Sequence, residues 1–213
     1  MRTTFKTVSL ADQVFERLEN DIIQGVYPKG EILTELKLVE QLGVSRTPIR
    51  EALRRLEHER LIEDAGKGSR VLGISEEDVM DIMNIRKHIE ALATYYATIN
   101  MTPEGIEQLG NIVDLMDFYY AKWDPEHLRR ADDDFHEAIC NLSRRTVIKD
   151  TLIPLHRKTR RYRKIAMEDK CRATFTLQEH HEIFEAIRSG NADLAKELSR
   201  KHIINAKAHM FGE

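Results

Sequence analysis

The stretch GVSRTPIREAL, residues 43–53, carries the clearest structural signal in this chain of 213 residues. Gly43 predicts the end of one helix and a tight turn, and Ser45 is a typical N-cap for the next helix. Pro48 fits the first turn of that next helix, where backbone N–H groups have no partner within the helix. A short helix over residues 35–42 is predicted directly before the turn. Two short helices joined by a tight turn indicate a helix-turn-helix.

The second of these helices has an apolar face and a polar face. Its apolar residues recur at helical spacing and predict a buried stripe of Ile49, Ala52, Leu53 and Leu56. Arg46, Thr47 and Arg50 crowd its solvent-facing first turn. A helix-turn-helix reads bases with the first residues of its second helix, and arginine binds guanine O6 and N7 bidentately. Charge runs usually only solvate a helix, but the position of this run favours contact with DNA.

Two short strands are predicted after the second helix, at residues 61–63 and 69–71. They flank a glycine-rich basic tip that contains Lys67. A hairpin in this position makes the domain a winged helix-turn-helix. Farther upstream, Ser9 is expected to cap a helix that ends at Gly25.

Composition limits the class of protein without identifying it. The 33 basic and 36 acidic residues give a net charge of −3, so charge permits DNA binding but does not demonstrate it. Five prolines and ten glycines predict a mainly α protein. Two cysteines cannot build a disulfide framework and suit a reducing compartment. No apolar run is long enough to span a membrane and no signal peptide is evident, so we expect a cytoplasmic protein without a membrane partner.

The remaining two thirds of the chain are predicted to be helical. The domain boundary is expected between residues 73 and 74, which separates a winged helix-turn-helix domain (1–73) from an all-α antiparallel bundle (74–213). About six helices are expected in the bundle, at residues 75–99, 102–121, 125–143, 145–168, 174–189 and 191–210.

Four polar residues interrupt the apolar stripes of three of these helices: Asp132, His136, His180 and His202. Burial of such side chains is costly unless they are paired or bind a metal. One carboxylate and three imidazoles suit a divalent transition metal, zinc in the first place and otherwise nickel, manganese or iron, with coordination positions left open. A hydrogen-bonded polar core is the alternative, and spacing alone does not separate the two. The neighbouring His181 falls on the wet face of its helix.

Other polar residues of the bundle are expected to be structural. The basic run from Arg157 to Lys164 is predicted to be a solvated helix face, from which one arginine could turn inward to a carboxylate. His156 has no predicted partners. Cys140 is expected to be a buried, inert thiol.

The stretch 43–53, followed by Leu56, Gly66 and Gly68, resembles the winged-helix domain of the GntR family of bacterial transcription regulators. The resemblance implies that the recognition helix contacts operator DNA through Ser45, Arg46, Thr47 and Arg50. It also implies a wing that reaches the minor groove through Lys67, Gly68 and Ser69. The chain departs from the family pattern at Leu36, where many members carry an arginine after a glutamate.

The bundle is similar to the ligand-binding domain of the FadR subfamily, the FCD type, in four motifs: Ile85-Arg86-x-x-Ile89-Glu90, Asp132-x-x-Phe135-His136, Glu179-His180-x-x-Ile183 and Arg200-x-His202. In the metal-binding branch of this subfamily, the Asp and three His of these motifs hold the ion. The resemblance further implies a homodimer on a palindromic operator and a small carboxylate effector, for which Arg86 is a candidate anchor. The turn at residues 143–145 lacks an asparagine that is common there.

We therefore predict a transcription regulator, not an enzyme, whose operator affinity is controlled by a carboxylate effector bound near the metal. The competing hypothesis is a hydrolase-like metalloenzyme with an appended DNA-binding domain, because an open metal site can activate water. The chain lacks a His-Glu-x-x-His motif and an obvious general base, which counts against that hypothesis. A metal-free regulator with a polar core is the third possibility.

Overall fold

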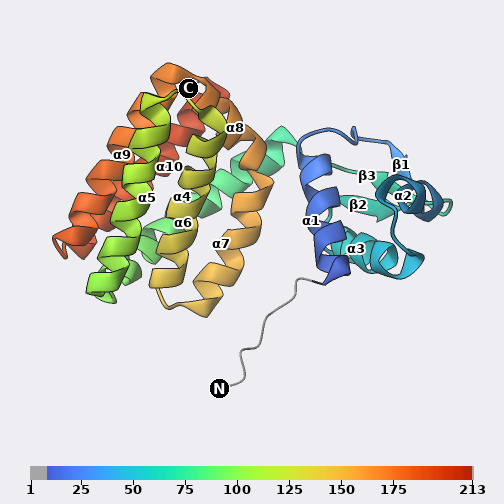
Figure 1. The fold of residues 1–213 in the computed structure, drawn as a ribbon, viewed down its shortest axis with the longest axis horizontal. Helices are drawn as coiled ribbons and strands as arrows, with labels where there is room; N and C mark the ends of the chain where they lie inside the picture. The colour runs from blue at the N-terminus through green and yellow to red at the C-terminus, as the bar shows by residue number, and fades with distance from the viewer. Residues whose placement is uncertain (1–8, 213) are drawn as a thin grey trace. The chain divides into compact units, whose positions relative to one another are not determined.

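The computed structural model describes residues 9–212. The chain divides into two compact units, the first ending at Ser75 and the second beginning at Glu76 (Figure 1). This division lies two residues after the boundary expected from the sequence.

The first unit is a helix-turn-helix followed by a small sheet. Its elements are α1 (Leu10–Ile23), β1 (Ile32–Leu33), α2 (Glu35–Leu42), α3 (Arg46–His58), β2 (Ile62–Asp64) and β3 (Ser69–Val71). Ser9 begins α1 with a capping box, in which its hydroxyl accepts from the Asp12 N–H and the Asp12 carboxylate accepts from the Ser9 N–H. Gly43 ends α2 in the left-handed conformation, with φ 66°, which glycine adopts without strain. The turn predicted from the sequence is therefore present.

The core of this unit is built on the predicted stripe of α3. Ile49, Ala52 and Leu56 are fully buried, and Leu53 packs against them from a half-buried position. They meet Leu18 and its apolar neighbours on α1. Because these residues fill the interior, the opposite face of α3 is left to solvent.

The wing is part of a three-stranded antiparallel sheet with the order β1-β3-β2. The sequence predicted the β2–β3 hairpin but not β1, because two residues are too short for an alternating pattern. β1 pairs with β3 through Ile32 opposite Arg70 and Leu33 opposite Ser69. Gly68 begins this close approach: a Cβ atom there would lie 2.6 Å from the Leu33 carbonyl oxygen. The sheet therefore requires glycine at this position.

The second unit is an all-α bundle. Its helices are α4 (Glu76–Ile99), α5 (Pro103–Ala121), α6 (Pro125–Leu142), α7 (Thr146–Lys158), α8 (Arg160–Glu168), α9 (Lys170–Arg188) and α10 (Ala192–Phe211). In Figure 1 the long helices lie side by side, with α4 packed along α10 and α5 against both α6 and α9. Buried apolar residues between them form one continuous core that includes Leu109, Phe135 and Ile183. The predicted fold class is confirmed.

Two helix boundaries differ from the prediction by more than one residue. The expected helix over 145–168 is divided into α7 and α8 at Thr159, whose hydroxyl bonds the carbonyl oxygens of Leu155 and His156 and accepts a hydrogen bond from Arg86. A threonine side chain that bonds the backbone in this way competes with helix continuation. The next helix begins at Lys170 and not at residue 174, because the Asp169 carboxylate caps it.

Candidate functional site

The recognition helix presents its polar residues to solvent. Arg46, Thr47 and Arg50 are exposed in the first turn of α3, as the sequence predicted. Arg50 donates to the Glu35 carboxylate over 2.7 Å, and this pair holds the start of α3 against the start of α2. The pairing raises the pKa of Arg50 and lowers that of Glu35 through their mutual hydrogen bond. A DNA phosphate or base could replace this half-buried carboxylate as the partner of Arg50.

Ser45 occupies the N-cap position of α3, but its side chain makes no capping hydrogen bond. Its exposed hydroxyl can therefore donate to a phosphate oxygen, which is a common backbone contact to DNA. Leu36, at the departure from the family pattern, is 59% exposed on the adjacent helix. An apolar side chain at that place offers contact with a thymine methyl group but no charge.

The three predicted contact residues of the wing differ in their surroundings: one is an exposed cation, and the other two lie at the start of strand β3. Lys67 is exposed at the tip, whereas Gly68 and Ser69 are half-buried where β3 begins. The carbonyl oxygen of Gly68 accepts a hydrogen bond from Ala65, which closes the tip. Gly68 thus has a structural role besides any contact with DNA.

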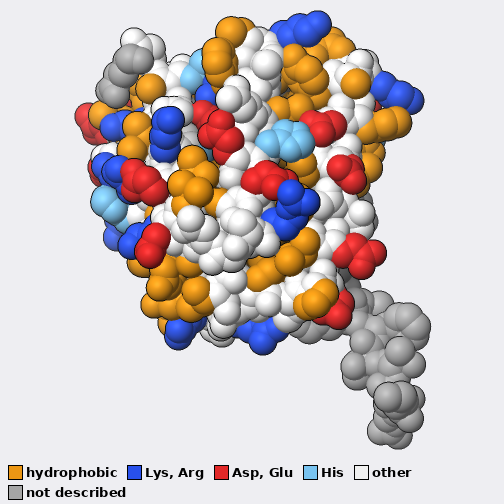
Figure 2. Space-filling view, turned by 90° about the vertical axis from the view of Figure 1, so that its left-hand side faces the viewer, with side chains coloured by type: hydrophobic (Ala, Val, Ile, Leu, Met, Phe, Trp, Pro, Cys, Tyr) orange, Lys and Arg blue, Asp and Glu red, His pale blue; other side chains and the backbone are white. Residues whose placement is uncertain are grey.

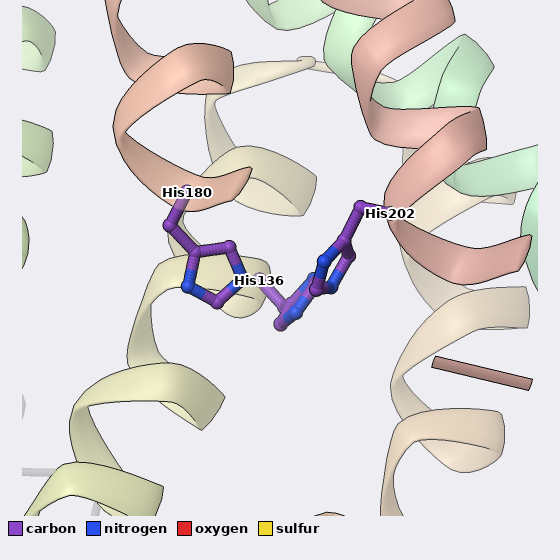
Figure 3. Close-up of side chains that lie close together, drawn as sticks. All are labelled: His136, His180 and His202. Carbon is purple, nitrogen blue, oxygen red and sulfur yellow. The ribbon is translucent and has the colours of Figure 1, made fainter. Parts of the chain in front are cut away.

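The second unit brings the four predicted ligand residues together in its interior. Asp132 and His136 come from α6, His180 from α9 and His202 from α10. They are 2%, 6%, 1% and 4% exposed, respectively. Figure 3 shows the three imidazoles turned toward one another from these helices. The ring centroids lie 4.7–5.3 Å apart, and each histidine offers a nitrogen within 4.8 Å of the others.

Asp132 stands at the edge of the histidine cluster. Its Oδ1 lies 3.6 Å from His180 Nε2 and 4.0 Å from His136 Nε2. The spacing of four residues between Asp132 and His136 places both on one face of α6. The three histidines form one group of possible metal ligands, and Asp132 borders that group through His180 and His136.

Two carboxylates orient the imidazoles from behind. Glu90 on α4 accepts from His136 Nδ1 over 3.0 Å, and Glu179 on α9 accepts from His202 Nδ1 over 2.7 Å. A metal-binding histidine usually bonds a carboxylate through its other nitrogen, which fixes the ring and the tautomer. Both rings thus direct Nε2 toward the cluster, as a metal site requires.

The donor set fits a divalent cation. Among the described residues, both nitrogens of His180 are buried without a hydrogen-bond partner, whereas Oδ2 of Asp132 is paired with Arg163 Nε at 3.1 Å. Buried polar atoms without partners are costly, and a polar core would be expected to pair them. Burial lowers the pKa of His136 to about 3 and that of His180 well below its usual range. Neutral imidazole is the form that binds metal.

A second group of possible ligands adjoins the first. Glu90, His136 and His156 bring ligand atoms within 4.8 Å of one another, and His156 Nε2 lies 3.0 Å from Glu90. The prediction that His156 has no partners is therefore wrong, because α7 carries it to the buried Glu90 of α4. His136 faces both groups, so Glu90 and His156 extend the polar core behind the cluster.

Arg86 is buried beside Glu90. It donates to the Glu90 carboxylate over 2.6 Å and to the Thr159 hydroxyl over 2.7 Å. An effector that used this guanidinium would have to exchange with one of these partners. Its role as an anchor stays a prediction.

Sequence reasoning assigned no role to Glu90 or Glu179, and it expected that one arginine of the run from Arg157 to Lys164 could turn inward without identifying that arginine. Glu90 and Glu179 each lie in a motif with a predicted functional residue, and buried glutamates near histidines were the available signal. Arg163 turns inward from the basic run of α8 to Asp132 and Asp133. The helical pattern identified the run but did not identify which arginine is buried.

Surface charge marks no site on the face drawn in Figure 2, where acidic and basic side chains are interspersed with hydrophobic ones. Among the described helices, none combines the length and the apolar character that a membrane span requires. The candidate sites are thus the exposed end of α3 and the buried histidine cluster.

Comparisons with known proteins match both units. The model for bacterial regulatory proteins of the gntR family matches residues 10–71, and the FCD domain model matches residues 81–205. The transcriptional regulator YdhC of Bacillus subtilis is 28% identical over 93% of this chain and 89% of its own length. A probable D-xylose utilization operon transcriptional repressor of Paenarthrobacter nicotinovorans is 26% identical over 96% of this chain and 91% of its own.

A solved structure shares the fold over nearly the whole chain. The E. coli protein McbR/YncC matches with a TM-score of 0.81 at 22% identity, over 97% of this chain and 99% of that protein.

Proposed function

Because this chain belongs to the GntR family of bacterial regulatory proteins and carries an FCD domain, we propose that it is a cytoplasmic repressor controlled by a metal-bound carboxylate effector. That it is a DNA-binding transcription regulator follows from the family itself. The sign of regulation, the operator, the dimer, the metal and the effector are part of this proposal.

The observation that carries the DNA-binding role is the exposed first turn of α3. Arg46, Thr47 and Arg50 project from a helix whose other face is fixed in the core. This is the arrangement by which a recognition helix enters the major groove. Lys67 on the wing supplies a phosphate or minor-groove contact next to it.

A homodimer is proposed because one recognition helix reads only a half-site, so a palindromic operator needs two copies. An apolar stripe on the outer face of α4 supports it. Ile85, Leu92 and Ile99 recur at seven-residue intervals and are 45%, 40% and 55% exposed. Such spacing is typical of helices that pair along a seam.

Leu92→Glu should convert a dimer into monomers, because it places a charge in the middle of that stripe. Sedimentation equilibrium measures the change, and Val147→Glu, at a site 81% exposed on α7, is the matched control. A Leu92→Glu protein that remains dimeric at micromolar concentration would remove α4 from the interface.

The sensory role is proposed from the histidine cluster. Asp132, His136, His180 and His202 would hold a divalent ion, for which zinc is the first choice given imidazole and carboxylate donors. The ion would supply a Lewis-acid position for a carboxylate oxygen of the effector. Effector binding would then bias the dimer between two half-site spacings, a shift of population without chemistry.

The competing proposal of a metalloenzyme gains no support from the relatives, which carry the names of transcription regulators. The described carboxylates near the cluster are also engaged: Glu90 and Glu179 hold histidines. A general base would need a free carboxylate at the substrate.

Selection of bound duplexes from a random DNA library tests the function directly. The purified protein should enrich a palindrome whose half-sites are separated by about one helical turn. An effector among candidate carboxylates should change the affinity for that sequence in a gel-shift titration. Failure to enrich any sequence, with the folded protein confirmed by circular dichroism, would overturn the proposal.

A further inference from the structure

One arginine of α8 lies in the interior of the bundle. The Arg163 side chain is 7% exposed, with Nε 3.1 Å from Asp132 Oδ2 and Nη1 paired with Asp133. Burial opposes its charge, but the carboxylates of Asp133 and Asp132 outweigh burial and raise the pKa of Arg163. The guanidinium is therefore a buried cation in contact with a predicted metal ligand.

The carboxylate of Asp133 does not depend on Arg163 alone. Arg129 Nη1 lies 2.5 Å from Asp133, and Arg160 Nε lies 3.5 Å from it. Three guanidinium groups thus surround one carboxylate. If Asp132 also gives its charge to a divalent ion, Arg163 keeps only the carboxylate of Asp133, which it shares with Arg129 and Arg160. Two neighbouring cations in a buried site favour an anion between them.

Two further buried polar atoms without hydrogen-bond partners lie on α8 and α9. Among the described residues, Arg163 Nη2 and Thr176 Oγ1 are buried and make no hydrogen bond, like the two nitrogens of His180. Thr176 is 2% exposed and lies four residues before His180, so both are on the inward face of α9. Arg86 differs, because its guanidinium already serves Glu90 and Thr159.

We propose that Arg163, and not Arg86, anchors the carboxylate of the effector, with the Thr176 hydroxyl as a second donor. This rests on the proposed metal site, whose open positions would take a carboxylate oxygen. Arg163 offers the two N–H groups of Nη2, and Thr176 offers its hydroxyl. Arg163 contacts Asp132, whose Oδ1 lies 3.6 Å from His180 Nε2, and Thr176 lies one turn before His180 on α9. The effector is accordingly an anion, and an uncharged isostere binds poorly.

Cobalt provides the test, because the visible absorption of protein-bound Co²⁺ changes when its ligands change. The full-length protein is loaded with Co²⁺ and titrated with acetate, L-lactate, succinate and citrate, and with acetamide as the uncharged control. We expect a saturable spectral change with at least one carboxylate and none with acetamide at equal concentration.

Three variants assign the anchor. Arg163→Met should retain one Co²⁺ per chain but bind the anion roughly 10- to 100-fold more weakly, the range for a hydrogen bond to a charged group. Arg163→Lys should recover part of this loss. Thr176→Val should weaken anion binding by a smaller factor without lowering the melting temperature of the metal-loaded protein, since it removes an unpaired buried hydroxyl. Arg160→Met, on the same helix and beside the same Asp133, is the control and should bind like the wild type.

The outcomes separate the anchor from the metal. A wild type that holds Co²⁺ but responds to no carboxylate overturns the inference, as does an Arg163→Met protein with the wild-type midpoint. A wild type that takes up no metal refutes the metal site. The anchor alone would then be supported if a carboxylate still raises the melting temperature of the wild type and of Arg160→Met but not that of Arg163→Met. Absence of both metal and carboxylate binding overturns both.

Discussion

In the first unit, the candidate contact residues Arg46, Thr47 and Arg50 lie on the surface, whereas the candidate ligands of the second unit lie in its core. The recognition helix is fixed by Ile49 and Leu56 on its other face, so its polar side chains can change without loss of packing. The histidine cluster has no such separation. His136, for example, bonds Glu90 and contacts Phe135, and each is a buried part of the bundle. Substitutions at the candidate site should therefore change DNA binding with little effect on stability in the first unit, whereas in the second unit they should change metal binding and stability together.

Loss of the metal tests whether metal binding and stability are coupled in the second unit, and it should give the largest change in melting temperature. A ligand present at a thousandfold excess over its dissociation constant stabilises the folded state by about 4 kcal/mol. Chelation should therefore lower the melting temperature of the wild type by many degrees. His180→Ala should already lack stoichiometric metal and respond little to chelator. Metal per chain, by mass spectrometry, and thermal melts with and without chelator measure both.

His181→Ala is the matched control for that comparison. His181 is the adjacent residue, its side chain is 44% exposed, and it bonds Asp117 on the surface. This variant should keep its metal and the response to chelator. The metal site is refuted if both variants lose metal equally, or if the wild type holds no metal after incubation with zinc. The four residues would then form a hydrogen-bonded polar core without an ion.

Gly68→Ala tests a position of the first unit that is both a predicted DNA contact in the wing and part of the packing between β1 and β3. The added Cβ would lie 2.6 Å from the Leu33 carbonyl oxygen, so β1 and β3 must move apart. We expect a loss of roughly 1–3 kcal/mol of stability, as for other strained backbone positions. Chemical denaturation followed by circular dichroism measures it. Gly66→Ala, where no atom lies within 4 Å, is the comparison for the same backbone region and should cost less.

The sequence predicted most of the first unit because its signals are local. Gly43 and Ser9 act within one turn of the chain, and the stripe from Ile49 to Leu56 follows from one helix. β1 was missed because its two residues have no pattern of their own and depend on β3. A two-residue strand is defined by its hydrogen bonds to a neighbouring strand, so its own residues do not identify it.

In the second unit, the sequence located the ligands but not their supports. Asp132 and His136 stand out as polar residues on an apolar stripe, and His180 and His202 do the same on two other helices. Arg163 lies in a run of basic residues from which one arginine was expected to turn inward, but the spacing of the run did not identify it, and it lies on α8 just after the break at Thr159. Thr159 also accepts a hydrogen bond from Arg86, 73 residues away along the chain, a contact that no local pattern records.

Arg46→Ala and Arg50→Ala test whether DNA binding in the first unit can be changed with little loss of stability. Both side chains are exposed and Arg50 loses only a surface ion pair with Glu35, which contributes little to stability, so the melting temperature should fall by no more than a few degrees. Affinity for the selected operator should fall roughly 10- to 100-fold for whichever arginine reads a base, with relaxed preference at that position. Gel-shift titrations against the operator and single-base variants measure this. Unchanged affinity in both variants would remove the recognition role from α3.

Lys67→Ala should give the smallest effect and a different kind of effect. Lys67 is exposed at the wing tip, where its cation can reach a phosphate but is bonded to no described residue. Loss of one phosphate contact should weaken binding to all sequences alike, by a few-fold at moderate salt. It should also reduce the slope of log affinity against log salt by roughly 0.9. Titrations at several salt concentrations, with the operator and with a scrambled duplex, distinguish this from the arginine variants. If Lys67→Ala changes the preferred sequence and leaves the salt slope intact, the wing reads bases, and both elements of the surface would then specify the operator.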